Sequence, residues 1–281
     1  MPPQMPPSSH AATLSELLLV SGTDLFALGH YPGAPIYPGV MLLDRMLALA
    51  NRLATTVTGR PMRVRRASRV QYLDAILPGD VVDLQVAVRT TGPEGLTLAA
   101  TAGVRGAPSA RATFICGAPC PVIDPPAALQ APPLPVMTHR DIAGLLPHRY
   151  PFLLVDAVQA YTPGSQIRAC KLATRQSPLF AAQAPDTYPA GLAIESLGQA
   201  GIALFFLGQT GRAPVEVVLG AIAGIELLRD IPFDSVLTLD ARIDRLLPNA
   251  VVFGGEIRIG STPVIRVGSL VAMIDPRHVP S

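Results

Sequence analysis

The segments YPGVMLLDRMLALANRL, residues 37–53, and YPAGLAIESLGQAGIALF, residues 188–205, decide the fold of this chain. Each begins with Tyr-Pro and continues as a long apolar run with one acidic residue, Asp44 or Glu195, six positions after the proline. Proline suits the first turn of a helix, where its missing N–H has no partner in any case. Each segment therefore predicts a helix, and one so apolar must be buried on most sides.

Strand-like runs follow each predicted helix. The first half contains VVDLQVAV, LTLAATAGV and ARATFIC, and the second contains VLTLDARI, AVVFGGEIRI and VIRVGSLVAMI. These runs are rich in branched residues, alternate in part and end at Gly, Pro or Asn, which is typical of antiparallel strands. The repeat, at an offset near 151 residues between Pro38 and Pro189, indicates an internal duplication. We expect an α+β fold in which an antiparallel sheet wraps around a long central helix in each half.

A proline-rich stretch, GAPCPVIDPPAALQAPPLPVM, separates the two halves. It carries almost no charge and shows neither a helical nor a strand period, which is typical of a semi-rigid extended linker. We therefore expect a first domain at 12–117, a linker at 118–137 and a second domain at 138–276. The second half also opens with LLPHRYPFLLVDAVQAY, residues 145–161, which lacks a clear counterpart in the first half. The first half is therefore interpreted as a trimmed copy.

The composition excludes several classes of function. Lys and Arg number 22 and Asp and Glu 20, so no global nucleic-acid footprint is indicated. Three cysteines, an odd number, favour reduced thiols in a cytoplasmic protein. Cys116 and Cys120 lack a second pair at zinc spacing, so we expect neither a metal nor a cofactor.

Targeting signals are not predicted. The start, MPPQMPPSSHAA, lacks the basic and apolar blocks of a signal peptide. The most apolar segment, residues 190–208, contains Glu195 and Gln199, whereas a membrane span is nearly free of such groups. A buried helix of a soluble, cytoplasmic protein is the better interpretation.

The stretch GHYPGAPIYPGV, residues 29–40, surrounds His30 with glycines and prolines that restrict the backbone. Pre-positioning of this kind suits a general base, although an isolated His is more often structural. Glu195 has apolar neighbours in its helix that offer it no partner. It is either an acid facing a crevice or a carboxyl of raised pKa kept for proton transfer. Asp44 adjoins Arg45, so that part of its helix is expected to be wet.

The segment LFALGHYPGAPIYPGVMLLDRM, residues 25–46, resembles the signature F-x-G-H-F-P-G-x-P-I-M-P-G-V of the hot-dog-fold 3-hydroxyacyl-[acyl-carrier-protein] dehydratases. Tyr31 and Tyr37 replace the family's Phe and Met. The second half resembles the same family through LLPHRYPFLLVD, residues 145–156, and AIESLGQAG, residues 193–201. The resemblance implies a tandem (double) hot-dog fold, that is, a fused pseudo-dimer, and leaves a higher homo-oligomer open.

In that family the active site lies between two hot dogs. The resemblance therefore implies that His30 of the first half meets Glu195 of the second, with backbone N–H groups at Gly39 and Val40 holding the thioester carbonyl. Gly39 is expected to be glycine because a side chain would crowd that carbonyl. In the reciprocal site Gln183 occupies the His position opposite Asp44. Because an amide has no useful basicity near neutral pH, that site is expected to be inactive.

The implied activity is dehydration of 3-hydroxyacyl thioesters, linked to acyl carrier protein, to trans-2-enoyl thioesters in fatty acid, aryl polyene or polyketide-type biosynthesis. The implied partner is an acidic acyl carrier protein with its phosphopantetheine arm. A basic cluster could steer its docking, or could equally be a solvated strand edge; it consists of Arg60, Arg63, Arg65, Arg66 and Arg69. His148 and Arg149 belong to a family motif and are expected to be structural.

Three alternatives stay open. The missing His in the second half is also typical of catalytically silent dehydratase-like partners that only bind the acyl chain or its carrier. An Asp at position 44 leaves a dehydratase/isomerase open, and a hot-dog thioesterase is the third, although such enzymes lack the His-containing loop. The separation of the His30 imidazole from the Glu195 carboxylate discriminates among them, since an enzyme needs the two groups within about one water of contact.

Overall fold

The computed structural model describes residues 12–92, 95–121, 123, 133–176, 180, 185–209 and 216–275. The first half contains β1 (Thr13–Leu19), α1 (Leu25–His30), α2 (Gly39–Thr58), β2 (Arg63–Tyr72), β3 (Val81–Gly92), β4 (Gly95–Val104) and β5 (Ala107–Gly117). The second half contains β6 (Met137–Thr138), α3 (His139–Leu145), β7 (Ala157–Thr162), β8 (Gln166–Ala173), α4 (Ala190–Leu207), β9 (Glu216–Leu227), β10 (Ser235–Leu247), β11 (Ala250–Ile259) and β12 (Thr262–Asp275).

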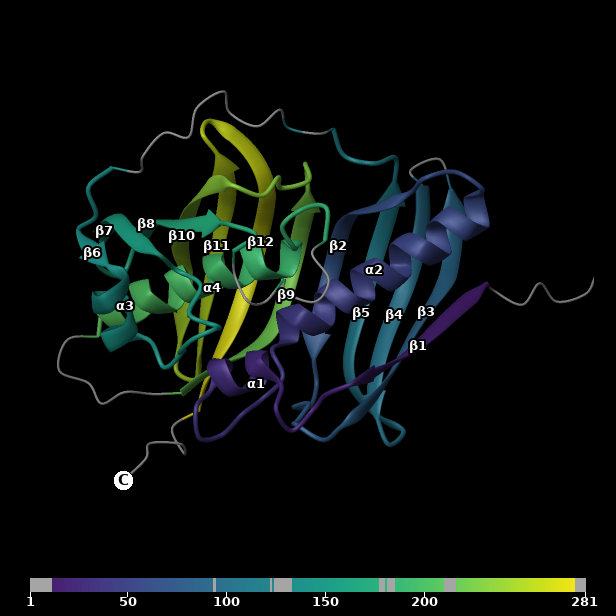
Figure 1. The fold of residues 1–281 in the computed structure, drawn as a ribbon, viewed down its shortest axis with the longest axis horizontal. Coiled ribbons are helices and arrows are strands. Elements are labelled where there is room, and N and C mark those ends of the chain that lie inside the picture. Colours follow the sequence, from purple (N-terminus) through teal and green to yellow (C-terminus); the bar gives the residue numbers. More distant parts are fainter. Residues whose placement is uncertain are drawn as a thin grey trace, which may run out of the picture.

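All twelve strands form one antiparallel sheet in the order β1-β3-β4-β5-β2-β9-β12-β11-β10-β8-β7-β6. The halves meet where β2 pairs with β9, from Arg66 opposite Glu226 to Gln71 opposite Ala221. Figure 1 shows α2 lying against the strands of the first half and α4 against those of the second. The predicted arrangement, one long helix against an antiparallel sheet in each half, is confirmed.

Both long helices begin where the sequence predicted. Pro38 is the N-cap of α2 and Pro189 that of α4. Gly59, with φ 65°, ends α2 in the left-handed conformation that glycine tolerates without strain. By strand order β1 corresponds to β8, so β6, α3 and β7 are additions of the second half. The interpretation of the first half as a trimmed copy therefore agrees with the sheet.

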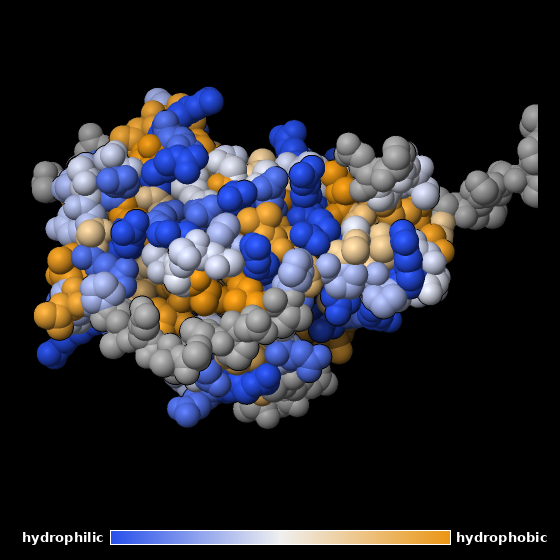
Figure 2. All heavy atoms as spheres, turned by 90° about the horizontal axis from the view of Figure 1, so that it is seen from above, coloured by the Kyte–Doolittle hydropathy of each residue, from blue (hydrophilic) through white to orange (hydrophobic). Residues whose placement is uncertain are grey.

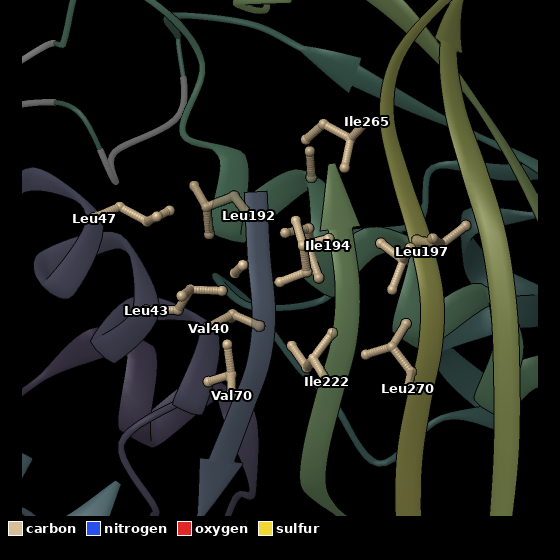
Figure 3. Packing of buried hydrophobic residues seen from close by; sticks show 14 of the residues in the cluster. Val40, Leu43, Leu47, Val70, Leu192, Ile194, Leu197, Ile222, Ile265 and Leu270 are labelled. Carbon is tan, nitrogen blue, oxygen red and sulfur yellow. The ribbon is translucent and has the colours of Figure 1, made fainter. Parts of the chain in front are cut away.

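The core is continuous across the junction. Figure 3 shows apolar side chains from both helices and from strands on both sides of it, namely Val40, Leu43, Leu47, Val70, Leu192, Ile194, Leu197, Ile222, Ile265 and Leu270. Among the described helices, α4 is long and apolar enough to cross a membrane, but 67% of that window is buried inside the protein. It is the core helix that the sequence predicted.

The outer surface is mixed in character. Seen from above, hydrophilic residues are spread over the described surface, with hydrophobic residues in separate patches between them (Figure 2). Scattered exposed apolar residues are normal for soluble proteins. The two long helices instead bury their apolar residues against the sheet.

We expect the two halves to unfold together. Ile222, on β9 opposite Val70 of β2, is fully buried at the junction, and replacing such a side chain by alanine costs about 2–5 kcal/mol. Ile222→Ala should lower the free energy of unfolding by that amount in a single transition, measured by denaturant titration. The exposed Val57→Ala in α2 should change it by no more than about 0.5 kcal/mol. Two separate transitions in the unmodified chain would contradict the shared core.

Candidate active site

His30 is the last residue of α1, a single helical turn held at its start by Asp24, whose Oδ1 accepts the Ala27 N–H at 2.9 Å. The His30 Nδ1 lies 3.1 Å from the Ile36 carbonyl oxygen. Because a carbonyl only accepts, Nδ1 carries the proton and Nε2 keeps its lone pair. The Gly/Pro loop therefore fixes both the orientation and the tautomer of the imidazole.

The end of α1 packs directly on the second half. The Gly29 carbonyl accepts the Arg149 N–H at 2.8 Å. A Cβ at position 29 would lie 2.9 Å from Pro151 Cδ and 3.0 Å from the Arg149 oxygen, so the close approach requires glycine. The His30 ring lies edge-on to Phe152, with 5.3 Å between ring centroids. Residues 149–152 of the second half thus form the surface on which the His30 loop rests.

Glu195 lies in the second turn of α4 and is 9% exposed. Its apolar neighbours offer it no partner, as expected, but the Gln199 Nε2, one turn later, donates to its Oε1 at 3.1 Å. Gln199 also donates to the Phe152 carbonyl at 2.9 Å and accepts the Leu154 N–H at 2.8 Å. One buried amide thus connects α4 to the segment that supports His30, and it orients Glu195.

The structure brings His30 and Glu195 together. One potential ligand atom from each of His30, His148 and Glu195 lies within 4.8 Å of the other two. The His148 Nε2 is 3.6 Å from the Glu195 Oε1, and His148 is 1% exposed. His30 and Glu195, no more than 4.8 Å apart, are therefore within the reach of one bridging water, which is the separation expected of an enzyme.

His148 is the site residue that sequence reasoning missed. A purely structural role was expected, but its ring lies 5.4 Å from that of His30 and faces the same carboxylate. The available signal was its motif: LLPHRYPFLLVD was the second strong family match, and it carries the second half's buried histidine. Arg149, beside it, is structural as expected, because its guanidinium donates to the carbonyls of residues 146–148.

Burial sets the protonation of the three groups. Loss of solvent lowers the pKa of His30 to about 4, although the Ile36 carbonyl opposes the shift. Burial, together with the neighbouring His30 and Arg149, holds the pKa of His148 well below its usual 6.5. Burial raises the pKa of Glu195 to about 7 against the hydrogen bond from Gln199. Near neutral pH the site therefore contains two uncharged imidazoles and a carboxyl that is about half protonated.

The same three side chains are potential metal ligands, a set that the sequence analysis did not consider. The His148 Nδ1, however, is buried without a hydrogen-bond partner among the described residues. A metal-bound imidazole normally donates its other N–H to an acceptor, so these residues fit a resident metal poorly. Cys116 and Cys120 are free buried thiols, and burial raises the pKa of Cys116 to about 12. The expectation of no metal stays a prediction.

Gly39 and Val40 form the first turn of α2, where backbone N–H groups lack partners within the helix and the helix dipole is positive. A Cβ at Gly39 would lie 2.7 Å from Cε1 of the Tyr72 ring. The ring of Tyr72 therefore gives a reason of its own for glycine at this position, and the expected reason, crowding of a thioester carbonyl, stays a prediction. The Tyr72 hydroxyl is buried and unpartnered within the described part of the chain.

The helix around Asp44 is partly wet, as expected, because Arg45 and Arg52 are exposed; the Asp44 carboxyl itself is half-buried, with its Oδ2 shielded from solvent. Its Oδ1 accepts the Gly191 N–H at the start of α4 at 2.8 Å, and burial raises its pKa to about 7. At the offset of 151 residues, Gly191 corresponds to Val40. Asp44 therefore accepts the Gly191 N–H, which is the counterpart in the second half of the Val40 N–H expected to hold the thioester carbonyl. Gln183 lies outside the described residues.

The basic cluster is divided in the structure. Arg65 is half-buried and donates across the junction to the Leu227 carbonyl at 3.1 Å, and to the Ala118 carbonyl at 3.2 Å, so its role is structural. Arg66 pairs with Glu226 at 3.6 Å. Arg60, Arg63 and Arg69 are exposed. Of the five expected docking residues, Arg65 and Arg66 therefore contact the second half across the junction, and Arg65 does so while half-buried.

Comparison with known proteins agrees with this arrangement. The family model described as "ApeI-like: ApeI dehydratase" matches residues 8–104. The 3-hydroxyacyl-[acyl-carrier-protein] dehydratase FabZ of Paracidovorax citrulli is 36% identical over 132 residues, which cover 45% of this chain and 90% of that protein. The chain belongs to this FabZ dehydratase family. FabZ of Nitratidesulfovibrio vulgaris is 43% identical over 96 residues, 34% of this chain and 61% of that protein.

Solved structures extend the likeness over nearly the whole chain. The dehydratase domain of PpsC from Mycobacterium tuberculosis, in complex with C12:1-CoA, gives a TM-score of 0.63 at 15% identity and covers 97% of both chains. A monomeric dehydratase domain from a trans AT polyketide synthase split module gives 0.68 at 10% identity, covering 94% of this chain and all of that one. At such identities the likeness shows the fold alone. The tandem hot-dog fold predicted for this FabZ-family chain is confirmed.

The protonation states can be measured directly. Because burial lowers the pKa of both His30 and His148, their ring nitrogens should keep the chemical shifts of neutral imidazole at pH 6.5 in ¹⁵N NMR titration, and those of His30 down to about pH 5, with assignment from His30→Ala and His148→Ala variants. The Nδ1 of His30 should carry the proton. Protonation of either ring near its usual pKa of 6.5 would show that these rings are hydrated rather than buried.

Proposed function

We propose that this FabZ-family chain dehydrates 3-hydroxyacyl thioesters, carried by acyl carrier protein, to trans-2-enoyl thioesters. The observation that carries the proposal is the approach of His30 and Glu195, from different halves, to within 4.8 Å in a buried site. The printed activity of the FabZ relatives and the dehydratase family match support it. The pathway, whether fatty acid, aryl polyene or polyketide-type, stays open.

The protonation states suit the two halves of the reaction. Neutral His30 accepts the C2 proton through Nε2, and the electron pair released moves toward the thioester carbonyl. N–H groups at Gly39 and Val40 stabilise the negative charge on that oxygen, helped by the dipole of α2. Protonated Glu195 then donates to the C3 hydroxyl, the C3–O bond breaks, and water leaves. His30 finally returns its proton to Glu195 through a water.

One working site in each chain follows from the same assignment. The reciprocal position lacks a histidine, since Gln183 stands there, and Asp44 already binds the Gly191 amide. This reciprocal site is therefore proposed to be inactive for two reasons: it lacks a general base, and its backbone N–H donor is already bound by Asp44. This arrangement also argues against isomerisation through Asp44, because no second imidazole faces it in the described part of the chain.

The carrier protein is proposed to dock through Arg60, Arg63 and Arg69, three exposed members of the basic cluster; Arg66 is exposed too but pairs with Glu226. Oppositely charged surfaces raise the rate of encounter more than they raise affinity. A cytoplasmic location is proposed on the grounds of the odd cysteine count and the FabZ relationship. The competing functions are a silent acyl-binding partner and a thioesterase. A thioesterase shares the fold: the structure of "oleoyl thioesterase (putative)" from Lactobacillus plantarum gives a TM-score of 0.59 at 11% identity.

Substitution of the paired groups tests the proposal. His30→Ala and Glu195→Gln should each lower hydration of a crotonyl thioester by about 10²–10⁴-fold, because each removes one proton-transfer group. Asp44→Asn keeps an oxygen for the Gly191 N–H and should retain most activity. Loss of activity in Asp44→Asn together with an active Glu195→Gln would refute the assignment, and hydrolysis in place of hydration would favour the thioesterase.

The pH dependence has a predicted sign. Dehydration needs His30 deprotonated and Glu195 protonated, so kcat/KM should be highest between their pKa values of about 4 and about 7. It should fall as the pH rises through 7, because Glu195 loses its proton. Asp44→Asn is the matched control, since the pKa of Asp44 is also about 7 and its removal should leave this limb in place. If Asp44→Asn abolishes the fall of kcat/KM above pH 7, that fall belongs to Asp44 and the assignment to Glu195 is wrong.

A further inference from the structure

A small cavity extends from the paired groups into the apolar core. On one side it is lined by His30, His148 and Glu195, and on the other by Gly198, Phe253 and Leu270. Its volume is about 30 Å³, so it is a small cavity. The cavity therefore connects the polar end of the site to a short apolar space between α4 and the sheet.

Two glycines of α4 shape this space. Gly198 and Gly201 are three residues apart and so share one face of the helix. A Cβ at Gly198 would meet no atom within 4 Å, so the helix is open to the cavity there. A Cβ at Gly201 would lie 2.9 Å from the ring of Phe253, so this second glycine lets the ring pack directly on the helix. Within one turn of α4, Gly198 thus leaves space beside the helix, and Gly201 lets Phe253 pack against it.

Phe253 forms part of the apolar wall of the cavity. It lies on β11, opposite Leu270 of β12, and is 1% exposed. Interiors are close-packed, so a ring held between a helix backbone and a sheet does not move aside without repacking its neighbours. Tyr31 of the first half also lines the cavity, and its hydroxyl donates to the Val217 carbonyl at the start of β9. The small space beside Glu195 is therefore walled by rings that their neighbours hold in place.

We propose that the chain is selective for thioesters with short acyl chains of the hydroxybutyryl type, that Phe253 sets the length limit and that Gly198 leaves room for the tail. The inference rests on the proposed function and deepens it by naming the substrate class. With the thioester at the amides of α2 and C3 near Glu195, the carbons beyond C3 enter the cavity. A terminal methyl group fits there, whereas a longer tail meets the Phe253 ring.

Turnover of a graded series tests the length limit. The unmodified chain should give a kcat/KM at least tenfold higher with 3-hydroxybutyryl than with 3-hydroxyoctanoyl or 3-hydroxydodecanoyl carrier protein. Phe253→Ala should reduce or reverse that ratio, chiefly by lowering KM for the longer substrates. Phe253→Leu keeps a buried apolar side chain and serves as the test if the alanine variant fails to fold. It should shift the ratio of kcat/KM values in the same direction. A flat or opposite profile in the unmodified chain, or an unchanged ratio in both variants, would overturn the inference.

Filling the opening provides the matched control. Gly198→Leu places a side chain in the cavity and should raise KM for every substrate at least tenfold. Gly144→Leu, at an exposed α3 position where a Cβ also meets no atom within 4 Å, should leave KM unchanged. Equal KM values in the two variants would overturn the proposed tail site.

Binding separates failure of the inference from failure of the proposed function. Calorimetry with Glu195→Gln should show tighter binding of crotonyl pantetheine than of octenoyl or dodecenoyl pantetheine. Short-chain binding without turnover in the unmodified chain would refute the dehydratase but uphold the tail site. Turnover without a length preference would uphold the dehydratase but refute the tail site. If neither turnover nor a preference for short chains were found, both proposals would be refuted.

Discussion

The pairing of β2 with β9 is the constraint on which the site depends, because His30 and Glu195 belong to different halves of the chain. A shared sheet fixes α4 relative to α2, and it brings residues 148–154 of the second half under the loop of the first. The Gly29–Arg149 hydrogen bond and the Gln199 amide then connect the two acid–base groups through only a few residues. Neither half contains both members of the His30–Glu195 pair.

The energetic cost of this arrangement is concentrated in its buried titratable groups. A carboxylate removed from water without a charged partner is unfavourable, and the chain keeps Glu195 and Asp44 buried while their pKa values rise to about 7. The two acids started from equivalent positions and now differ in their partners. Glu195 faces two imidazoles and a cavity, whereas Asp44 caps the opposite helix. The two acids therefore have different partners, and catalysis is proposed for Glu195 alone.

Much of this could be predicted from the sequence because the deciding signals are local and strongly patterned. The Tyr-Pro helix starts at Pro38 and Pro189 and the alternating strands specify the two units, and the Gly/Pro loop marks His30. The remainder depended on tertiary contacts that no spacing reveals. The approach of His148 to Glu195, the packing of the Tyr72 ring on Gly39 and the hydrogen bond from Gly191 to Asp44 all join segments that meet only after folding. The same holds for Arg65, whose charge suggested a free surface but whose guanidinium joins the halves.

The stoichiometry of ligand binding tests the central claim, a single acid–base site formed across the junction of unequal halves. Calorimetric titration of the full chain with a short enoyl thioester should give one site per chain, and His30→Ala should weaken that same site. Two sites per chain would contradict the account, because the second would have to use the amide that Asp44 occupies.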